Sequence, residues 1–230
     1  MGGLRSPLSQ REPLPALIAH ALSLSGAATP RVCVLNTANG DDPVSYQKFY
    51  AILSQNGARV SHLQLFAMPN VDDPEDLLLS QDVIFAGGGS VANMVAVWRV
   101  HGIDRIMRSA WESGVVLAGV SAGAICWFDG GTTDSFGPEL RPFTAGLGLL
   151  PGSYCPHYSS EPARRPTFQS LVADGTLPAG VACDDGAAAH FTDTELTAIV
   201  AARDGATGYL VEPDGSGGST ERPLTPVLLP

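Results

Sequence analysis

The stretch GVVLAGVSAGAICWF, residues 114–128, decides which fold the chain can adopt. Its first half is apolar and rich in β-branched residues, which is typical of a buried strand, and the small residues after Ser121 favour a helix. Gly119, Ser121 and Gly123 match the pattern G-x-S-x-G, in which a sharp strand-to-helix turn lifts a serine hydroxyl above the ends of a sheet. The same small residues could serve only to let the helix pack closely. The strand before them and the helix after them favour a nucleophile.

The rest of the N-terminal half alternates between the same two patterns. Short β-branched runs predict strands at residues 31–36, 58–66 and 82–89. Apolar residues at helical spacing predict helices at 14–22, 45–55, 74–80 and 90–114, the last of them broken at Gly102. Alternation of this kind is typical of an α/β fold with a mostly parallel sheet flanked by helices.

The C-terminal half is less regular. Its patterns predict an extended segment at 146–158, a helix at 164–175, and strands within 180–191 and 195–213 that include a turn at Asp204-Gly205. The last residues, GSGGSTERPLTPVLLP, are rich in Gly and Ser and then in Pro, which predicts a mobile tail. We therefore expect a single α/β domain over residues 1–213, followed by the tail over residues 214–230.

Composition limits the partners of the protein. The 230 residues carry a formal net charge of −10 and are 44% apolar, which is enough for one full hydrophobic core. Because so acidic a surface repels phosphate backbones and anionic lipid head groups, we expect no nucleic-acid or membrane partner. The four cysteines lie far apart and show no zinc-type spacing, which argues against a metal site and against disulfides. With no apolar run of membrane length, the sequence favours a cytoplasmic protein.

A serine hydroxyl needs a nearby base to act as a nucleophile at neutral pH. Of the five histidines, His157 stands at the end of a predicted extended segment and before a polar turn segment, YSSEPARRP. The other four lie inside or beside predicted elements, where structural or solvent-facing roles are common. His157 is therefore the candidate base.

Such a base is usually held in the correct tautomer by a carboxylate. Asp134, in GGTTDSFG, and the pair Asp184-Asp185, after the predicted strand GVAC, both suit this role, and both suit a plain turn. The residues alone do not choose between them. Backbone donors for an oxyanion are expected from the glycines 87–89, which follow a predicted strand, and from the N–H of Ala122.

Arg164 and Arg165 form the one adjacent pair of basic residues in this acidic chain, seven and eight residues after His157. A guanidinium at this place could bind a substrate carboxylate through two hydrogen bonds. A solvated charge pair is the plain alternative.

Five segments, taken together and in order, resemble the peptidase E family of serine aspartyl dipeptidases, which are related to cyanophycinase. The segments are GGGSVANMVAVWRVHG, GVVLAGVSAGAICWF, TDSFG, GLGLLPGSYCPHY and DDGAAAHF, and the resemblance extends from about residue 31 to residue 213. It implies a flavodoxin-like fold similar to that of the class I glutamine amidotransferases. It also implies cleavage of dipeptides that begin with aspartate, through an acyl-enzyme and without metal or cofactor.

Carried onto this sequence, the resemblance makes Ser121 the nucleophile, His157 its base and Asp185 the acid that orients the base. The backbone N–H groups of Gly88 and Ala122 match the family's oxyanion donors.

Further positions bear on the substrate. The family's carboxylate-binding arginine falls on Arg164, with Arg165 a near-equal match, and Asp134 matches another family acid near the site. The family usually has an asparagine after the three glycines, whereas this chain has Ser90, whose hydroxyl cannot supply an amide's donor and acceptor together. We therefore expect a serine-type dipeptidase whose preference for N-terminal aspartate is open to change by Ser90.

Two other functions stay open, since a fold does not dictate the leaving group. One is an esterase or amidase with a non-peptide substrate, and the other is a non-catalytic binding module that keeps the amidotransferase-like fold. An amidotransferase is disfavoured because that chemistry usually uses a cysteine at the turn, and Cys126 comes five residues after Ser121. The expected partner is a small peptide substrate, and apolar residues within 90–114 could support a homodimer.

Overall fold

The computed structural model describes residues 13–230, and its first four strands form the sheet that the sequence predicts. They are β1 (Arg31–Leu35), β2 (Arg59–Leu63), β3 (Val83–Ala86) and β4 (Val116–Gly119). Their order in the sheet is β2-β1-β3-β4, and every neighbouring pair is parallel. Parallel neighbours need crossover connections, which the alternating strand and helix patterns of the sequence supply.

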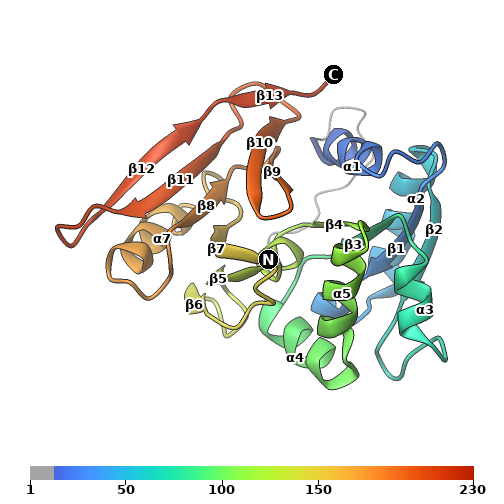
Figure 1. Cartoon of the computed structure of the whole chain (residues 1–230). Coiled ribbons are helices and arrows are strands. Elements are labelled where there is room, and N and C mark those ends of the chain that lie inside the picture. The colour runs from blue at the N-terminus through green and yellow to red at the C-terminus, as the bar shows by residue number, and fades with distance from the viewer. Residues whose placement is uncertain (1–12) are drawn as a thin grey trace.

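Helices cover both faces of this sheet. They are α1 (Pro13–Ser23), α2 (Pro43–Gln55), α3 (Pro74–Leu79), α4 (Val91–His101) and α5 (Ile103–Glu112), and all of them surround β1 to β4 on the right of Figure 1. Because successive side chains of a strand point to opposite sides, Val32 and Val34 pack with α1 and α2, whereas Cys33 and Leu35 pack on the side of α3, α4 and α5. The predicted break at Gly102 is confirmed, since this residue separates α4 from α5 with a left-handed φ of 72°.

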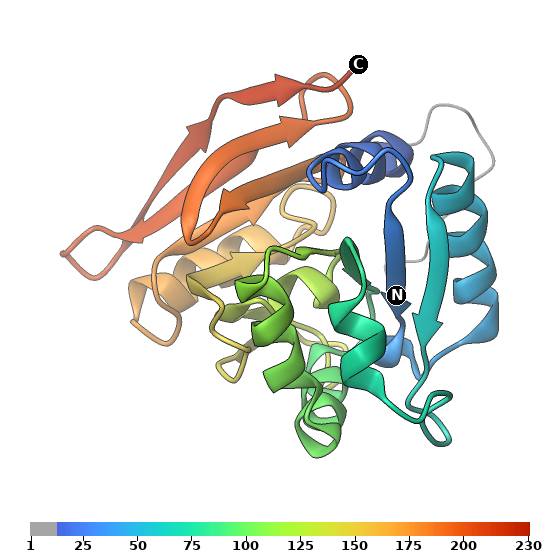
Figure 2. The ribbon, with the colours of Figure 1, turned by 45° about the vertical axis from the view of Figure 1, so that its right-hand side comes forward.

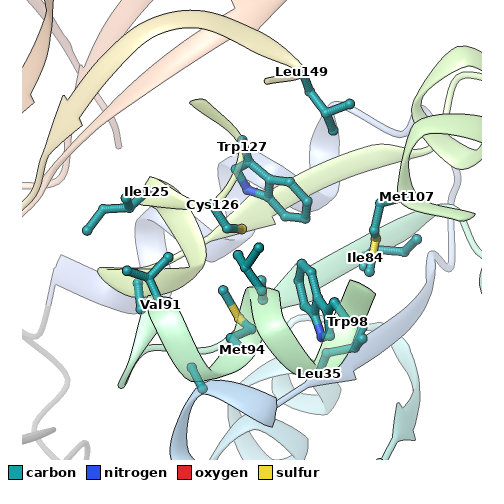
Figure 3. Packing of buried hydrophobic residues seen from close by; sticks show 14 of the residues in the cluster. Leu35, Ile84, Val91, Met94, Trp98, Met107, Ile125, Cys126, Trp127 and Leu149 are labelled. Atoms are coloured by element: carbon teal, nitrogen blue, oxygen red, sulfur yellow. The ribbon is translucent and has the colours of Figure 1, made fainter. Parts of the chain in front are cut away.

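The largest apolar cluster joins this sheet to the second half of the chain, and Figure 3 shows its centre. Trp98 of α4 and Trp127 are both buried there, with ring centroids 5.9 Å apart. The indole N–H of Trp98 donates to the hydroxyl of Thr37 over 3.0 Å, which satisfies the polar end of the ring. Met94 and Met107 are buried in the same cluster. Since burying a large apolar side chain contributes roughly 1.5–3 kcal/mol, this cluster fixes α4 against the segment that follows Ser121.

The second half of the chain is built on a six-stranded sheet. Its strands are β5 (Phe128–Thr133), β6 (Arg141–Phe143), β7 (Leu150–Cys155), β8 (Gly180–Cys183), β11 (Gly208–Pro213) and β12 (Ser219–Leu224). The order is β12-β11-β8-β7-β5-β6, with β5, β7 and β8 parallel and the outer strands antiparallel. Helix α7 (Arg164–Ala173) packs against β11 and β12, and Figures 1 and 2 show these elements at the end of the molecule away from β1 and β2.

A small third sheet completes the fold. It contains the hairpin of β9 (Ala187–Thr192) and β10 (Glu195–Ala201), with β13 (Pro226–Leu228) added parallel to β10. The predicted strands within 180–191 and 195–213 are thus present, but they belong to two sheets.

The C-terminal segment differs from its prediction as a mobile tail, because residues 219–228 lie largely in the paired strands β12 and β13. The Gly/Ser-rich part is the tight turn of a hairpin. A carboxylate oxygen of Asp214 accepts hydrogen bonds from the N–H groups of Ser216 and Gly218, over 2.7 and 2.9 Å. Gly215 and Gly217 have positive φ values, which allow the chain to reverse its direction between β11 and β12. These glycines therefore form a hairpin turn where the sequence suggested a flexible linker.

Candidate active site

Ser121 lies just beyond β4, on the turn into the one-turn helix α6 (Ala122–Ile125). Its backbone is left-handed, with φ 54° and ψ −116°, a conformation that costs a non-glycine residue roughly 1–3 kcal/mol. The carbonyl accepts hydrogen bonds from the N–H groups of Ala124 and Ile125, which start the helix. The hydroxyl does not cap the helix, so it is left for other interactions.

Close backbone packing explains why both flanking positions are glycine. A Cβ on Gly119 would lie 2.0 Å from the carbonyl oxygen of Gly123, and a Cβ on Gly123 would lie 2.1 Å from that of Ala86. Any larger side chain would push α6 away from the ends of β3 and β4. The sterics of this packing therefore hold Ser121 at its place beside the end of β3.

The glycine loop after β3 reaches Ser121 from the neighbouring strand. A Cβ on Gly88 would lie 3.3 Å from the Cβ of Ser121 and 4.0 Å from its Oγ. The N–H of Gly87 donates to the carbonyl of Leu35 over 2.8 Å, which ties the start of the loop to β1. Gly88 therefore lies close to Ser121, and Ala122 is the next residue after Ser121 in the chain. In this arrangement the backbone N–H groups of Gly88 and Ala122 could donate hydrogen bonds to an oxyanion.

His157 follows β7 and also has a left-handed backbone, with φ 57°. Its Nδ1 lies 2.6 Å from Oδ1 of Asp185, which stands between β8 and β9. This hydrogen bond is the main cause that lowers the pKa of Asp185, with smaller contributions from Ser160 and Arg203, while partial burial opposes them. Beside an ionised Asp185, Nδ1 carries a proton and Nε2 is left as the basic nitrogen.

The other candidate acids are placed differently. Asp134 is exposed in the turn after β5 and makes no contact with His157 in the part of the chain that the structure describes. Asp184 is buried and accepts a hydrogen bond from the N–H of Thr207 over 3.1 Å. The geometry therefore puts Asp185 beside the imidazole.

The serine and the imidazole come from adjoining elements. Helix α6, which begins next to Ser121, packs against β7, the strand that ends just before His157. Both residues follow strands that run parallel to their neighbours, and such folds bind ligands beyond the carboxyl ends of these strands. Residues 13–230 contain no direct hydrogen bond between the Ser121 hydroxyl and His157. In ligand-free enzymes this contact is often long and tightens when substrate binds.

The two adjacent arginines have separate environments. Arg164 is 2% exposed; its Nε donates to Glu161 over 2.7 Å and its Nη1 donates to the carbonyl of Thr132 over 2.8 Å. Arg165 is more open, with 41% of its side chain exposed, and its Nε lies 3.5 Å from a carboxylate oxygen of Glu221. Arg164 therefore anchors the start of α7 to β5, and only Arg165 of the pair keeps access to solvent.

Ser90 has a structural contact of its own. Its Oγ accepts a hydrogen bond from the N–H of Asn93 over 3.2 Å and so caps α4. Capping by serine typically stabilises a helix by about 1 kcal/mol.

The described residues of this region offer neither a metal site nor a reactive thiol. Within residues 13–230, His, Cys, Asp and Glu side chains form no group of three that could hold a metal ion. All four cysteines are free and buried, and burial raises the pKa of each thiol. Cys126 is thus kept in its unreactive thiol form close to Ser121. No helix in the described part of the chain has the length and apolar character needed to cross a membrane.

Arg203 is a residue that the sequence did not point to. Its Nη2 donates to the carbonyl oxygen of Asp185 over 2.7 Å, and its side chain packs over Gly186. The contact joins the turn before β9 to the end of β10, so no local pattern could have found it.

Comparisons with known proteins find relatives that match most of the chain. The model of the family described as Peptidase family S51 matches residues 5–199. The uncharacterized peptidase YgaJ of Bacillus subtilis (strain 168) is 44% identical over 192 residues, which is 84% of this chain and 82% of that protein. Peptidase E of Shewanella denitrificans is 28% identical over 118 residues, 51% of this chain and 50% of its own length.

Solved structures show the same fold. A peptidase from an acI-B1 actinobacterium superposes with a TM-score of 0.65 at 17% identity, covering 93% of this chain and 88% of that one. A Listeria monocytogenes EGD-e protein assigned to peptidase E gives 0.56 at 14% identity, with 92% and 95% coverage. The flavodoxin-like, single-domain α/β fold expected from the sequence is that of these peptidases. With the family match spanning most of its length, the protein belongs to peptidase family S51 and is a peptidase.

Proposed function

We propose that the protein is a serine-type dipeptidase that cleaves small peptides through an acyl-enzyme on Ser121. The observation that carries this proposal is the strained, left-handed turn that presents the Ser121 hydroxyl beside Gly88. Such strain persists only where surrounding structure imposes it, and here the glycines at 119 and 123 do so. The His157–Asp185 hydrogen bond supplies the base that a serine needs.

The reaction follows from these positions. Nε2 of His157 takes the hydroxyl proton as Ser121 Oγ bonds to the peptide carbonyl carbon, and the N–H groups of Gly88 and Ala122 donate to the resulting oxyanion. Asp185 accepts the Nδ1 proton's hydrogen bond and stabilises the imidazolium. His157 then gives its proton to the leaving amine as the C–N bond breaks. Water, deprotonated by His157, hydrolyses the ester, which releases the acid and restores the hydroxyl.

Preference for an N-terminal aspartate is the finer part of the proposal and rests on the family resemblance. Arg164 is buried and donates to Glu161 and to the carbonyl of Thr132, so we assign the substrate carboxylate to Arg165 instead. Because the Arg165 side chain is partly exposed to solvent, its guanidinium can still donate hydrogen bonds to a substrate carboxylate. The Ser90 hydroxyl already caps α4, which supports weaker binding of the substrate's N-terminal aspartate than an asparagine side chain would give.

The test is ninhydrin-detected cleavage of Asp-Leu, Glu-Leu and Ala-Leu by the wild-type protein, with Ser121→Ala as the control. We expect cleavage that depends on Ser121 and is fastest for Asp-Leu. Equal rates on all three would remove the aspartate preference but keep the dipeptidase. Cleavage of short-chain esters alone would favour the esterase, and no turnover of any substrate would favour a binding module.

The proposal extends to location and assembly. Four free, buried thiols support a reducing compartment such as the cytoplasm. Val100, 83% exposed on α4, is an apolar residue that a homodimer could cover.

A further inference from the structure

Next to the His157–Asp185 pair in the chain lies a cluster of polar and aromatic side chains, of which only Arg165 has a part in the proposed reaction, as the partner of the substrate carboxylate. We call it the rear cluster; its members are Tyr158, Arg165, Gln169, Asp184, Tyr209 and Glu221. Tyr158 follows His157 directly in the chain, and Asp184 directly precedes Asp185. The rear cluster therefore adjoins both members of the pair through single peptide bonds.

Glu221 of β12 is the hub of the rear cluster. One of its carboxylate oxygens accepts a hydrogen bond from the Tyr158 hydroxyl over 2.5 Å and another from Nε2 of Gln169 over 2.9 Å. The same oxygen lies 3.5 Å from Nε of Arg165. Tyr158 is 1% exposed, so its hydroxyl would be left without water if this acceptor were removed. A buried hydroxyl without a hydrogen-bond partner destabilises the fold, which favours the arrangement with Glu221 in place.

Arg165 extends the cluster to the other half of the pair. Its guanidinium carbon lies 4.8 Å from the ring centroids of both Tyr158 and Tyr209. The Tyr209 hydroxyl in turn donates to the carboxylate of Asp184 over 3.4 Å. A cation held over two aromatic rings and paired with Glu221 thus links residue 158 to residue 184.

The backbone adds a direct tie between the same two segments. The N–H of Tyr158 donates to the carbonyl of Cys183 over 3.1 Å. Side chains and backbone together therefore fix the spacing between the segment with His157 and the segment with Asp185. A hydrogen bond of 2.6 Å between two partly exposed side chains needs such support from behind.

We propose that Glu221 is a positioning residue for the His157–Asp185 pair, acting through Tyr158 and through Arg165 stacked on Tyr158 and Tyr209. This inference rests on the proposed function for its kinetic consequence. Tyr209 and Glu221 lie beyond residue 199, where the match to the family model ends. The C-terminal hairpin of this chain thus serves the active site without touching the substrate.

The experiment compares Glu221→Ala and Glu221→Gln with Glu212→Ala in the cleavage of Asp-Leu, the dipeptide that the wild-type protein is expected to cleave fastest. Glu212 is an exposed glutamate of the neighbouring strand β11 and is the matched control. We expect Glu221→Ala to lower kcat roughly tenfold, as is common when the support of a functional histidine is lost. The KM for Asp-Leu should rise as well, because Glu221 also pairs with Arg165, the residue proposed to bind the substrate carboxylate. Glu221→Gln keeps an acceptor for Tyr158 and should restore most of kcat. Wild-type kcat in Glu221→Ala overturns the proposal, and so does an equal loss in Glu212→Ala.

A second readout does not depend on turnover. The proton on Nδ1 of His157 should give a low-field proton NMR signal, assigned by its loss in Asp185→Asn. We expect this signal to weaken in Glu221→Ala and to persist in Glu212→Ala; an unchanged signal in Glu221→Ala contradicts the proposal. If the wild-type protein cleaved no peptide, the proposed function would fail while this signal still decided the positioning role.

A third variant covers the case in which Glu221→Ala does not fold. Tyr158→Phe removes one hydroxyl and keeps the ring under Arg165. It should lower kcat and weaken the low-field signal in the same direction as Glu221→Ala. Wild-type kcat together with an unchanged low-field signal in Tyr158→Phe would overturn the proposal.

Discussion

Ser121 stands on a turn whose shape is set by backbone atoms, whereas His157 and Asp185 are held by side chains gathered from several strands and a helix. On the serine side, Gly119 and Gly123 leave no room for a Cβ, so the backbone has one available path. On the other side, the pair depends on hydrogen bonds that can weaken in steps. Changes to the first region should therefore act as all or none, and changes to the second should be graded.

The largest effect is expected from Ser121→Ala, which removes the nucleophile and leaves the turn intact. Peptidase activity should fall by about 10³-fold or more, because the remaining groups cannot form the acyl-enzyme. Labelling by a serine-directed phosphonate should disappear, while the exposed Ser109→Ala control stays active and labelled. Labelling that survives in Ser121→Ala would place the nucleophile elsewhere.

Asp185→Asn tests the other side of the comparison. An amide in this position favours the wrong imidazole tautomer, so kcat should fall roughly 10³-fold, with KM changed little. Asp134→Asn, an exposed residue without contact to the imidazole, serves as the control and should stay within a few-fold of wild type. A larger loss in Asp134→Asn than in Asp185→Asn would assign the orienting role to Asp134.

Gly119→Ala examines the backbone itself. The new Cβ would lie 2.0 Å from the Gly123 carbonyl oxygen, so the turn must shift. We expect a loss of about 2–3 kcal/mol in the free energy of unfolding, measured by urea denaturation. Gly114→Ala meets no atom within 4 Å but has a φ of +89°, and it should cost about 1 kcal/mol from backbone conformation alone. Equal losses in the two variants would show that close packing at Gly119 is not decisive.

The smallest effect concerns acid stability. The pKa of Asp185 is lowered in the folded protein, chiefly by the hydrogen bond from His157. Its ionised form therefore stabilises the fold above the unfolded pKa of about 3.9, and this stabilisation is lost as the pH falls through the folded pKa. The Tm of wild type should exceed that of Asp185→Asn at neutral pH, and the gap should close toward pH 3. Because Asp185 is about half exposed, the gap should be small. A gap that widens in acid would contradict a lowered pKa of Asp185.

The strands and helices up to Ser121 could be predicted because their patterns are local and strongly periodic. Strands β5 and β6 could not, since FDGGTT and RPF offer no clear alternation and become strands only through pairing with β7 and with each other. The tail failed for a similar reason: Gly and Ser serve equally in a linker and in a hairpin turn.

Within the candidate site, local signals singled out Ser121 and His157, but not which acid lies beside the imidazole. The structure places Asp185 there, and its catalytic role stays a prediction. The environments of Arg164 and Glu221 could not be predicted at all. Both depend on partners in distant segments, Thr132 for the arginine and Tyr158 for the glutamate.

The position of the C-terminal hairpin bears on how this chain can be shortened. A protein trimmed at residue 199, where the family match ends, would lose β11 and β12 and the partner strand β13. Strand β8 would then become an open edge with unpaired N–H and C=O groups, which is a template for self-association. A fragment that ends at residue 199 should therefore aggregate. The shortest form of this peptidase that stays free of aggregation should extend through residue 228, the end of β13.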